Sequence, residues 1–255
     1  MRERPNFLDL PARERKPRAV GVTHVLDTGG PLTGVHGMLR NAGAYIDMVK
    51  IGWGLSYVDA AVHDRVELYH SKGILVCLGG TLFEVAASQD KIPELLAWAK
   101  EIGVDAIEVS NGMCGLDETT KRRHVSQISE QIAVLAESGA KDAGAPVSAD
   151  AWLREMKSDL DAGARWVIAE GRESGTVGLY EADGAVREDL VDHLIGALGM
   201  DRLIFETPMK AQQVWFIRRY GPDVNLGNIA PADVLALETL RLGLRADTAA
   251  DRLSS

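Results

Sequence analysis

The sequence has few cysteines, no long apolar run, and fewer basic than acidic residues. Its two cysteines, Cys77 and Cys114, provide neither a disulfide framework nor a thiolate spacing for a metal, so free thiols in a reducing compartment are expected. No apolar stretch approaches the roughly 20 residues of a membrane-spanning helix, and no apolar signal core is visible, so a cytoplasmic protein is expected. The 28 Lys and Arg against 37 Asp and Glu give a formal charge of -9, which disfavours nucleic acid and anionic membranes as partners.

What is present is typical of a folded globular protein, with 46% hydrophobic and 25% charged residues. Residues 1–18 combine charges with three prolines and are expected to form an arm on the surface of the domain. From residue 19 onward, short β-rich apolar runs alternate with longer amphipathic segments. No repeat or linker interrupts this pattern, so we expect one domain at 19–248, followed by a tail at 249–255.

Eight strands and eight helices can be delimited in this domain. The expected strands are 20–26, 45–51, 74–78, 106–109, 132–136, 166–169, 203–205 and 224–226. The expected helices are 33–41, 57–71, 93–101, 117–130, 149–161, 188–197, 210–219 and 231–242. Eight βα units in about 230 residues predict the α/β class and a single (β/α)8 TIM barrel. A doubly wound sheet is the alternative if two or three strands are misassigned.

Acidic residues stand at the carboxyl ends of five expected strands. Side chains alternate along a strand, and in TIM barrels the inward residue at the carboxyl end faces the mouth where substrates bind. Alternation directs Glu108 and Ser110 inward, because Ile107 and Val109 form the apolar outer face. The same reasoning directs four further carboxylates inward: Glu137, Glu170, Glu206 and Asp27.

A single acid at a strand end is more often a helix cap or a solvated charge. Five carboxylates directed into one cavity, however, repel one another unless a cation lies among them. Carboxylate oxygens without His or Cys clusters favour a hard divalent ion, so Mg²⁺ is expected in preference to Zn²⁺.

Four cationic residues are expected at the same mouth. Lys50 lies within an apolar strand, where a lysine must face an anion or a carboxylate, and it is the best single functional candidate. Arg172 follows in a glycine-bounded turn, where its guanidinium could clamp a carboxylate or a phosphate. Lys141 and Lys210 stand in loops and are equally well explained as solvated lysines.

Glycine and asparagine mark other strand ends. Gly79 and Gly80 would let backbone N–H groups approach an oxyanion, although their spacing matches no nucleotide fingerprint and turn geometry explains many such glycines. Asn225 and Asn228 flank the last strand before a helix, where barrels often hold phosphate. Of the five tryptophans, Trp53 is the one expected outside the core. Together these features favour a barrel enzyme with a divalent metal and a small anionic substrate.

Seven strings, in order over nearly the whole chain, resemble the phosphosulfolactate synthase family. They are KPRAVGVTHVLDTG (16–29), YIDMVKIGWG (45–54), GGTLFE (79–84), AIEVSNG (106–112), DAGARWVIAEGRESG (161–175), LIFETPMKAQQVWFI (203–217) and VNLGNIAPADVLALETLRLGLRADT (224–248). The resemblance implies a (β/α)8 barrel that uses Mg²⁺ to add sulfite to phosphoenolpyruvate, giving (2R)-phospho-3-sulfolactate.

The resemblance implies a role in metal binding, substrate binding or catalysis for each candidate residue. Glu137, Glu170 and Glu206 are expected to bind the metal or support its ligands, assisted by Glu108 and Asp27. The residues expected to contact substrate are Lys50, Arg172, Thr81, Lys210, Asn225 and Asn228. Lys141 is the candidate proton donor, and Lys50 is the alternative donor.

Two departures from the family pattern leave other hypotheses open. Ala140 stands where similar archaeal sequences carry the first of two lysines, and Asn111 stands where they carry an acid. The alternatives are a barrel enzyme that adds another nucleophile to phosphoenolpyruvate, or a non-catalytic member like the plant heat-stress proteins that share the fold. The expected partners are phosphoenolpyruvate and sulfite, with no nucleic acid or membrane. A homo-oligomer is expected, with a trimer as one candidate.

Overall fold

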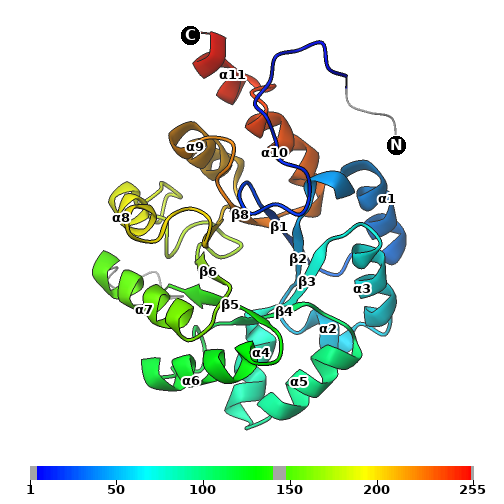
Figure 1. The fold of residues 1–255 in the computed structure, drawn as a ribbon, viewed down its shortest axis with the longest axis vertical. Helices are drawn as coiled ribbons and strands as arrows, with labels where there is room; N and C mark the ends of the chain where they lie inside the picture. Colours follow the sequence, from blue (N-terminus) through cyan, green and yellow to red (C-terminus); the bar gives the residue numbers. More distant parts are fainter. Residues whose placement is uncertain (1–4, 140–147, 254–255) are drawn as a thin grey trace.

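Residues 5–139 and 148–253, which the computed structural model describes, contain eight parallel strands that close into a barrel in chain order (Figure 1). The strands are β1 Thr23–Asp27, β2 Met48–Ile51, β3 Leu75–Leu78, β4 Ala106–Val109, β5 Ala133–Ser138, β6 Trp166–Ala169, β7 Leu203–Glu206 and β8 Leu226–Ile229. Because β8 pairs with β1, the sheet has no free edge. The predicted (β/α)8 TIM barrel is confirmed, and the doubly wound alternative is wrong.

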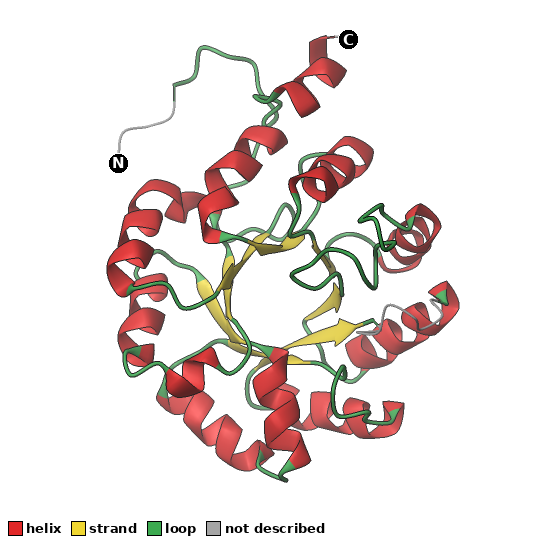
Figure 2. Cartoon of the chain, turned by 180° about the vertical axis from the view of Figure 1, so that it is seen from behind, coloured by secondary structure: helices red, strands yellow, loops and turns green. Residues whose placement is uncertain are grey.

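Helices surround the barrel as an outer ring (Figure 2). Along the described chain they are α1 Leu32–Ala42, η1 Gly43–Tyr45, α2 Leu55–Val58, α3 Val62–His70, α4 Gly80–Ser88, α5 Ile92–Glu101, α6 Glu118–Ser129, α7 Ala149–Asp161, α8 Glu188–Leu198, α9 Lys210–Tyr220, η2 Pro231–Asp233, α10 Val234–Arg241 and α11 Ala246–Leu253. Each expected strand and helix has a counterpart in this set. None of these helices is both long and apolar enough to cross a membrane.

Three details of the helical layer differ from the prediction. The single helix expected at 57–71 is divided into α2 and α3, because Asp59 turns the chain and accepts a hydrogen bond from the Ala61 N–H. Helix α4 was missed because Gly79, its N-cap, and Gly80, its first residue, resemble a loop. Helix α11 was not among the expected helices and spans the boundary expected at residue 248.

The strands separate two apolar layers. Met48, Cys77 and Leu135 are among the side chains packed together inside the barrel, whereas Ile107 and Val109 pack outward in the larger layer between strands and helices. Each fully buried side chain of this size contributes about 1.5–3 kcal/mol of hydrophobic stabilisation. This interior packing closes the lower part of the barrel and leaves its carboxyl end for polar residues.

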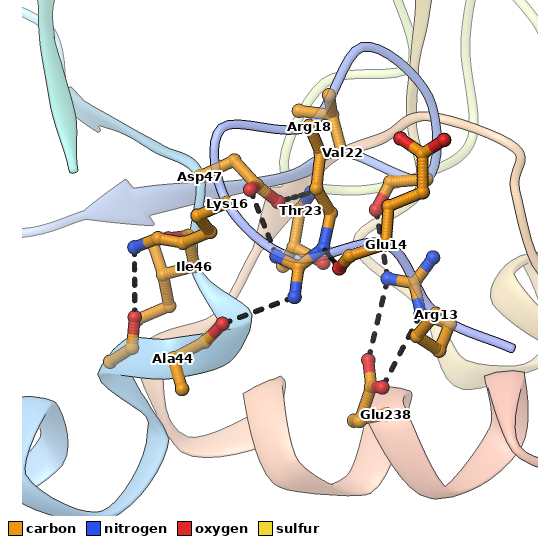
Figure 3. A network of polar contacts seen from close by, with 12 residues as sticks. Arg13, Glu14, Lys16, Arg18, Val22, Thr23, Ala44, Ile46, Asp47 and Glu238 are labelled. Carbon is orange, nitrogen blue, oxygen red and sulfur yellow. Dashed lines mark hydrogen bonds and ion pairs between the residues drawn. The ribbon is translucent and has the colours of Figure 1, made fainter. Parts of the chain in front are cut away.

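The N-terminal segment lies across the opposite, amino end of the barrel (Figure 3). Arg13 forms ion pairs with Asp223, just before β8, and with Glu238 on α10, at 3.2 and 3.3 Å. Arg18 pairs with Asp47, just before β2, at 2.9 Å. Three ion pairs of Arg13 and Arg18 therefore hold this segment against the barrel, all of them remote from the carboxyl ends of the strands.

Candidate active site

A cavity of about 370 Å³ opens at the carboxyl ends of the strands. Eight of the predicted site residues line it, from strands β2, β4, β5, β7 and β8 and the segments that follow β3 and β6: Lys50, Thr81, Glu108, Glu137, Glu170, Arg172, Glu206 and Asn228. Trp53 also lines the cavity and is 41% exposed. Alternation along the strands therefore predicted the four glutamates of the pocket, and the roles of the eight residues stay predictions.

Lys50 is the cationic centre of the pocket. Its side chain is 7% exposed, and its Nζ lies 2.9 Å from Glu108 Oε2 and 3.0 Å from Glu206 Oε1. Burial alone would lower the pKa of Lys50, but Glu108, Glu206 and Glu137 together raise it well above its ordinary value. Burial and the charge of Lys50 hold the pKa of His24 well below its ordinary value. The carboxylates around Lys50 therefore favour its charged form, whereas the surroundings of His24 favour a neutral imidazole.

Glu206 connects this lysine to the loop that follows β6. While Oε1 accepts from Lys50, Oε2 accepts hydrogen bonds from the backbone N–H groups of Gly171 and Arg172, at 3.0 and 2.9 Å. Gly171 is required here, because a Cβ would lie only 2.4 Å from Tyr180 Cε2 and 2.8 Å from the Glu206 carbonyl oxygen. The Tyr180 hydroxyl donates to that same carbonyl oxygen. Glu206 thus fixes both the cation and the loop.

Arg172 extends the positive charge toward the opening. Its backbone is in the left-handed region, with φ 58°, and its side chain is 45% exposed. The guanidinium Nε lies 3.6 Å from Glu170 Oε1, at the edge of the cavity. A partly exposed guanidinium and a buried lysine thus line the same cavity and provide two cations for a small anion that enters from solvent.

Three carboxylates form a group suited to a cation. One oxygen from each of Glu137, Glu170 and Glu206 lies within 4.8 Å of the others, and all three side chains are buried. Among the described residues no other group of His, Cys, Asp or Glu has this geometry. An all-oxygen set of acidic ligands fits Mg²⁺ in preference to Zn²⁺ or a softer metal.

The charged residues that line the described pocket are mostly acidic. Its carboxylates are the buried Glu108, Glu137, Glu170 and Glu206 and the exposed Glu173, and its cations are Lys50 and Arg172. Five formal negative charges against two positive charges leave an excess of three, two of which one Mg²⁺ ion would compensate. Because uncompensated buried charge is strongly unfavourable, a bound divalent cation would stabilise this arrangement.

Three predicted site residues lie elsewhere. Asp27 faces the helices, where it accepts hydrogen bonds from Arg65 and Tyr69 of α3 at 2.8 and 2.7 Å, so its predicted inward direction is wrong. The amide of Asn225 bonds the backbone of Val22, Met200 and Leu203 at the amino ends of the strands.

Lys210, at the start of α9, pairs with Asp247 of α11 at 2.7 Å and is not among the described residues that line the cavity. Lys210 therefore joins two helices in this structure, and its expected substrate contact stays a prediction. Lys141 and Ala140 lie outside the described residues, so the donor assignment stays a prediction.

Sequence reasoning missed Glu84, a fully buried carboxylate on α4. Its Oε1 accepts from Gly112 N at 3.1 Å and from the Ser110 hydroxyl, and its Oε2 accepts from the N–H groups of Met113 and Cys114 at 2.5 and 3.0 Å. The loop after β4 therefore folds around one side chain, and this loop carries Met113 into the cavity lining. An acid four residues after two glycines gives no local signal of such a role.

We expect Glu84→Gln to weaken the fold, because an amide nitrogen cannot accept the hydrogen bonds that one carboxylate oxygen now receives. The loss of buried acceptors predicts a decrease of about 2–3 kcal/mol in the free energy of unfolding. Urea denaturation measures this change, and limited proteolysis should show faster cleavage at 110–116. The exposed Glu94→Gln is the matched control and should change stability by less than about 0.5 kcal/mol. Equal stability of the two variants would contradict this function of Glu84.

The family model described as (2R)-phospho-3-sulfolactate synthase matches residues 11–247. The chain belongs to this family. The match includes the whole barrel and every cavity residue named above, so the resemblance of the seven sequence strings is confirmed.

Relatives within the family support the same assignment. The phosphosulfolactate synthase of Bacillus subtilis (strain 168) is 41% identical over 244 residues, covering 94% of this chain and 97% of its own. The phosphosulfolactate synthase of Methanothermobacter thermautotrophicus is 41% identical over 244 residues, covering 93% and 95%. Protein HEAT-STRESS-ASSOCIATED 32 of Arabidopsis thaliana is 24% identical over 268 residues, covering 92% and 91%. Both bacterial and archaeal synthases are thus similar to this chain over nearly their full length.

One solved structure is similar to this chain in its fold only. The YdjI aldolase from Escherichia coli K12 matches with a TM-score of 0.57 over 86% of this chain and 78% of its own, at 12% sequence identity. At that identity the likeness concerns the barrel and carries no information on substrate.

Proposed function

We propose that this chain catalyses the Mg²⁺-dependent addition of sulfite to phosphoenolpyruvate, giving (2R)-phospho-3-sulfolactate. The observation that carries the proposal is a pocket in which Lys50 pairs with Glu108 and Glu206 and which two further buried carboxylates, Glu137 and Glu170, also line, in a chain that belongs to the synthase family. The proposal includes a cytoplasmic location, because phosphoenolpyruvate is a cytoplasmic metabolite and both cysteines are free thiols.

The cations of the pocket are suited to an anionic substrate. Lys50 uses two of its three N–H donors on Glu108 and Glu206, which leaves one for a phosphate or carboxylate oxygen. Arg172 offers a planar fork of donors at the opening. Thr81 and Asn228 also line the cavity and add a hydroxyl and an amide. These groups would orient phosphoenolpyruvate with its methylene carbon open to sulfite.

Glu137, Glu170 and Glu206 would hold the metal. When bound there, Mg²⁺ supplies positive charge that stabilises the negative charge developing on the substrate carboxylate as the carbon–sulfur bond forms. Glu108 holds Lys50 and is itself fixed by the Gly80 N–H at 2.9 Å. In this proposal Glu137 and Glu170 bind the metal, Glu108 positions Lys50, and Glu206 does both.

The reaction ends with protonation of the carbon that bears the phosphate. The raised pKa of Lys50 argues that it keeps its proton and holds an anion. We therefore assign the proton to Lys141, as the family resemblance implies, although this residue lies outside the described part of the chain. Sulfite contributes the sulfur nucleophile, and the donated proton balances the addition.

Phosphorus NMR of the purified protein with phosphoenolpyruvate, sulfite and Mg²⁺ tests the proposal. We expect a new phosphate-ester resonance that grows only when both sulfite and metal are present. Parallel samples without sulfite, or with EDTA, are the controls. An unchanged phosphoenolpyruvate signal in every sample of folded protein would refute the synthase assignment. A resonance that forms without sulfite would indicate a different nucleophile.

A further inference from the structure

A second buried ionic cluster lies behind β5, outside the pocket. Lys121 of α6 is 1% exposed, and its Nζ lies 2.6 Å from Glu155 Oε1 and 2.7 Å from Asp159 Oδ2, both on α7. Its third hydrogen bond goes to the backbone carbonyl of Glu137, at 2.8 Å. All three donors of the ammonium group are therefore used, and one of them holds the strand end that carries Glu137.

This cluster is not explained by stability alone. A buried lysine with two acidic partners must be desolvated, and apolar side chains of similar volume often stabilise a core at least as well. What apolar side chains cannot do is donate a hydrogen bond to a backbone carbonyl. The contact between Lys121 and the Glu137 carbonyl is therefore the part of the cluster that requires a hydrogen-bond donor and that an apolar side chain could not replace.

The carbonyl that Lys121 contacts belongs to Glu137, a residue that lines the cavity. The Glu137 side chain faces the cavity, where its carboxylate groups with those of Glu170 and Glu206 within 4.8 Å. Glu206 is held by two backbone N–H groups and Lys50, so its place is fixed from the β6 loop. Lys121 provides the corresponding support for Glu137 from the helical layer.

We propose that Lys121 is a positioning residue, which fixes the backbone of Glu137 and thereby increases the affinity of the Glu137, Glu170 and Glu206 group for a divalent cation. This inference rests on the proposed metal site. Outer groups that orient metal ligands typically change metal affinity by about 10- to 100-fold when they are removed. Lys121 contacts neither substrate nor metal in this role.

Isothermal titration calorimetry with Mg²⁺ tests this role on three forms of the full chain. The first is the unchanged protein, and the second is Lys121→Met. The third combines Lys121→Met with Glu155→Met and Asp159→Leu, so that no unpaired carboxylate remains buried while the donor to the Glu137 carbonyl is still absent. We expect Mg²⁺ to bind at least about tenfold more weakly to both variants.

Arg65→Met is the matched control. Arg65 is also buried on a helix and also contacts two acids and one backbone carbonyl: Asp27, Asp59 and Gly30. None of these belongs to the metal group, so this variant should lose stability and keep its Mg²⁺ affinity within about twofold.

The outcomes separate the two proposals. If the unchanged protein binds Mg²⁺ and the folded triple variant binds it equally well, Lys121 has only a structural role and this inference is wrong, while the proposed function stands. Absence of Mg²⁺ binding to the unchanged protein would refute the metal site itself and the positioning role with it. Circular dichroism confirms that each variant is folded.

Discussion

Replacing Lys50 with methionine should lower kcat/KM by at least about 1000-fold and reduce stability at neutral pH. The change removes the cation that compensates Glu108 and Glu206, to which Lys50 is bonded at 2.9 and 3.0 Å. Removing one partner of a buried ion pair typically costs about 3–5 kcal/mol, because the remaining charge is left buried and unpaired. The loss of activity reflects both the missing anion contact and the displaced carboxylates.

The pH dependence gives this prediction a second measurement. Because the pKa of Lys50 is raised in the folded protein, its stabilising effect is complete below its ordinary pKa of about 10.4 and is lost only as the pH rises through the higher folded value. The unchanged protein should therefore show no loss of this contribution between pH 6 and 9. In Lys50→Met, acidification should recover part of the lost stability, because protonation neutralises the crowded carboxylates.

Thermal denaturation at several pH values and steady-state kinetics with saturating Mg²⁺ measure both effects. Lys91→Met removes the same charge from an exposed ion pair with Glu94 and is the control. It should retain full activity and nearly full stability. Near-normal turnover of Lys50→Met would remove Lys50 from the site.

Mg²⁺ should raise the melting temperature of the unchanged protein, and a Glu170→Gln, Glu206→Gln double variant should lose most of that increase. With Mg²⁺ at 100 times its Kd, preferential binding contributes about 2.7 kcal/mol, which corresponds to about 5–10 °C for a chain of this size. The variant replaces two of the three charged oxygen ligands by neutral amides. Turnover should fall with the loss of metal binding.

Differential scanning fluorimetry with and without Mg²⁺ measures the increase. A Glu94→Gln, Glu101→Gln variant removes the same charge from the exposed face of α5 and should keep the full effect. An unchanged increase in the Glu170→Gln, Glu206→Gln variant would place the metal elsewhere. A smaller increase in the α5 variant would mean that Mg²⁺ acts through overall charge and not through this pocket.

Side-chain alternation predicted the pocket where a strand offered one apolar and one polar face. In β4, Ile107 and Val109 fix the outer face, so Glu108 could only face inward, as it does. In β1, Val25 is equally compatible with either layer, because both faces of a parallel barrel are apolar. Val25 packs outward, and Asp27 follows it to the helices.

Residues with distant partners could not be predicted from local sequence. Lys121 and Glu84 look like ordinary polar residues of amphipathic helices, and their burial depends on contacts with other segments. Asn225 lies at the start of its strand and not at its end, so its amide satisfies backbone groups instead of facing the cavity. The partner of Lys210 lies 37 positions further along the chain, beyond the range of any local pattern.

The long-range contacts at the amino end of the barrel affect when the chain can fold during its synthesis. Arg13 bonds the Gly21 carbonyl before β1 and Asp223 before β8. It also bonds Glu238, which lies 225 positions away (Figure 3). Arg241 likewise bonds carbonyls of Val22 and Val224. The junction of the first and last strands therefore cannot form during synthesis until the final βα unit has left the ribosome. Contacts of such long range slow folding, so an emerging chain exposes an open sheet edge until its last helix arrives.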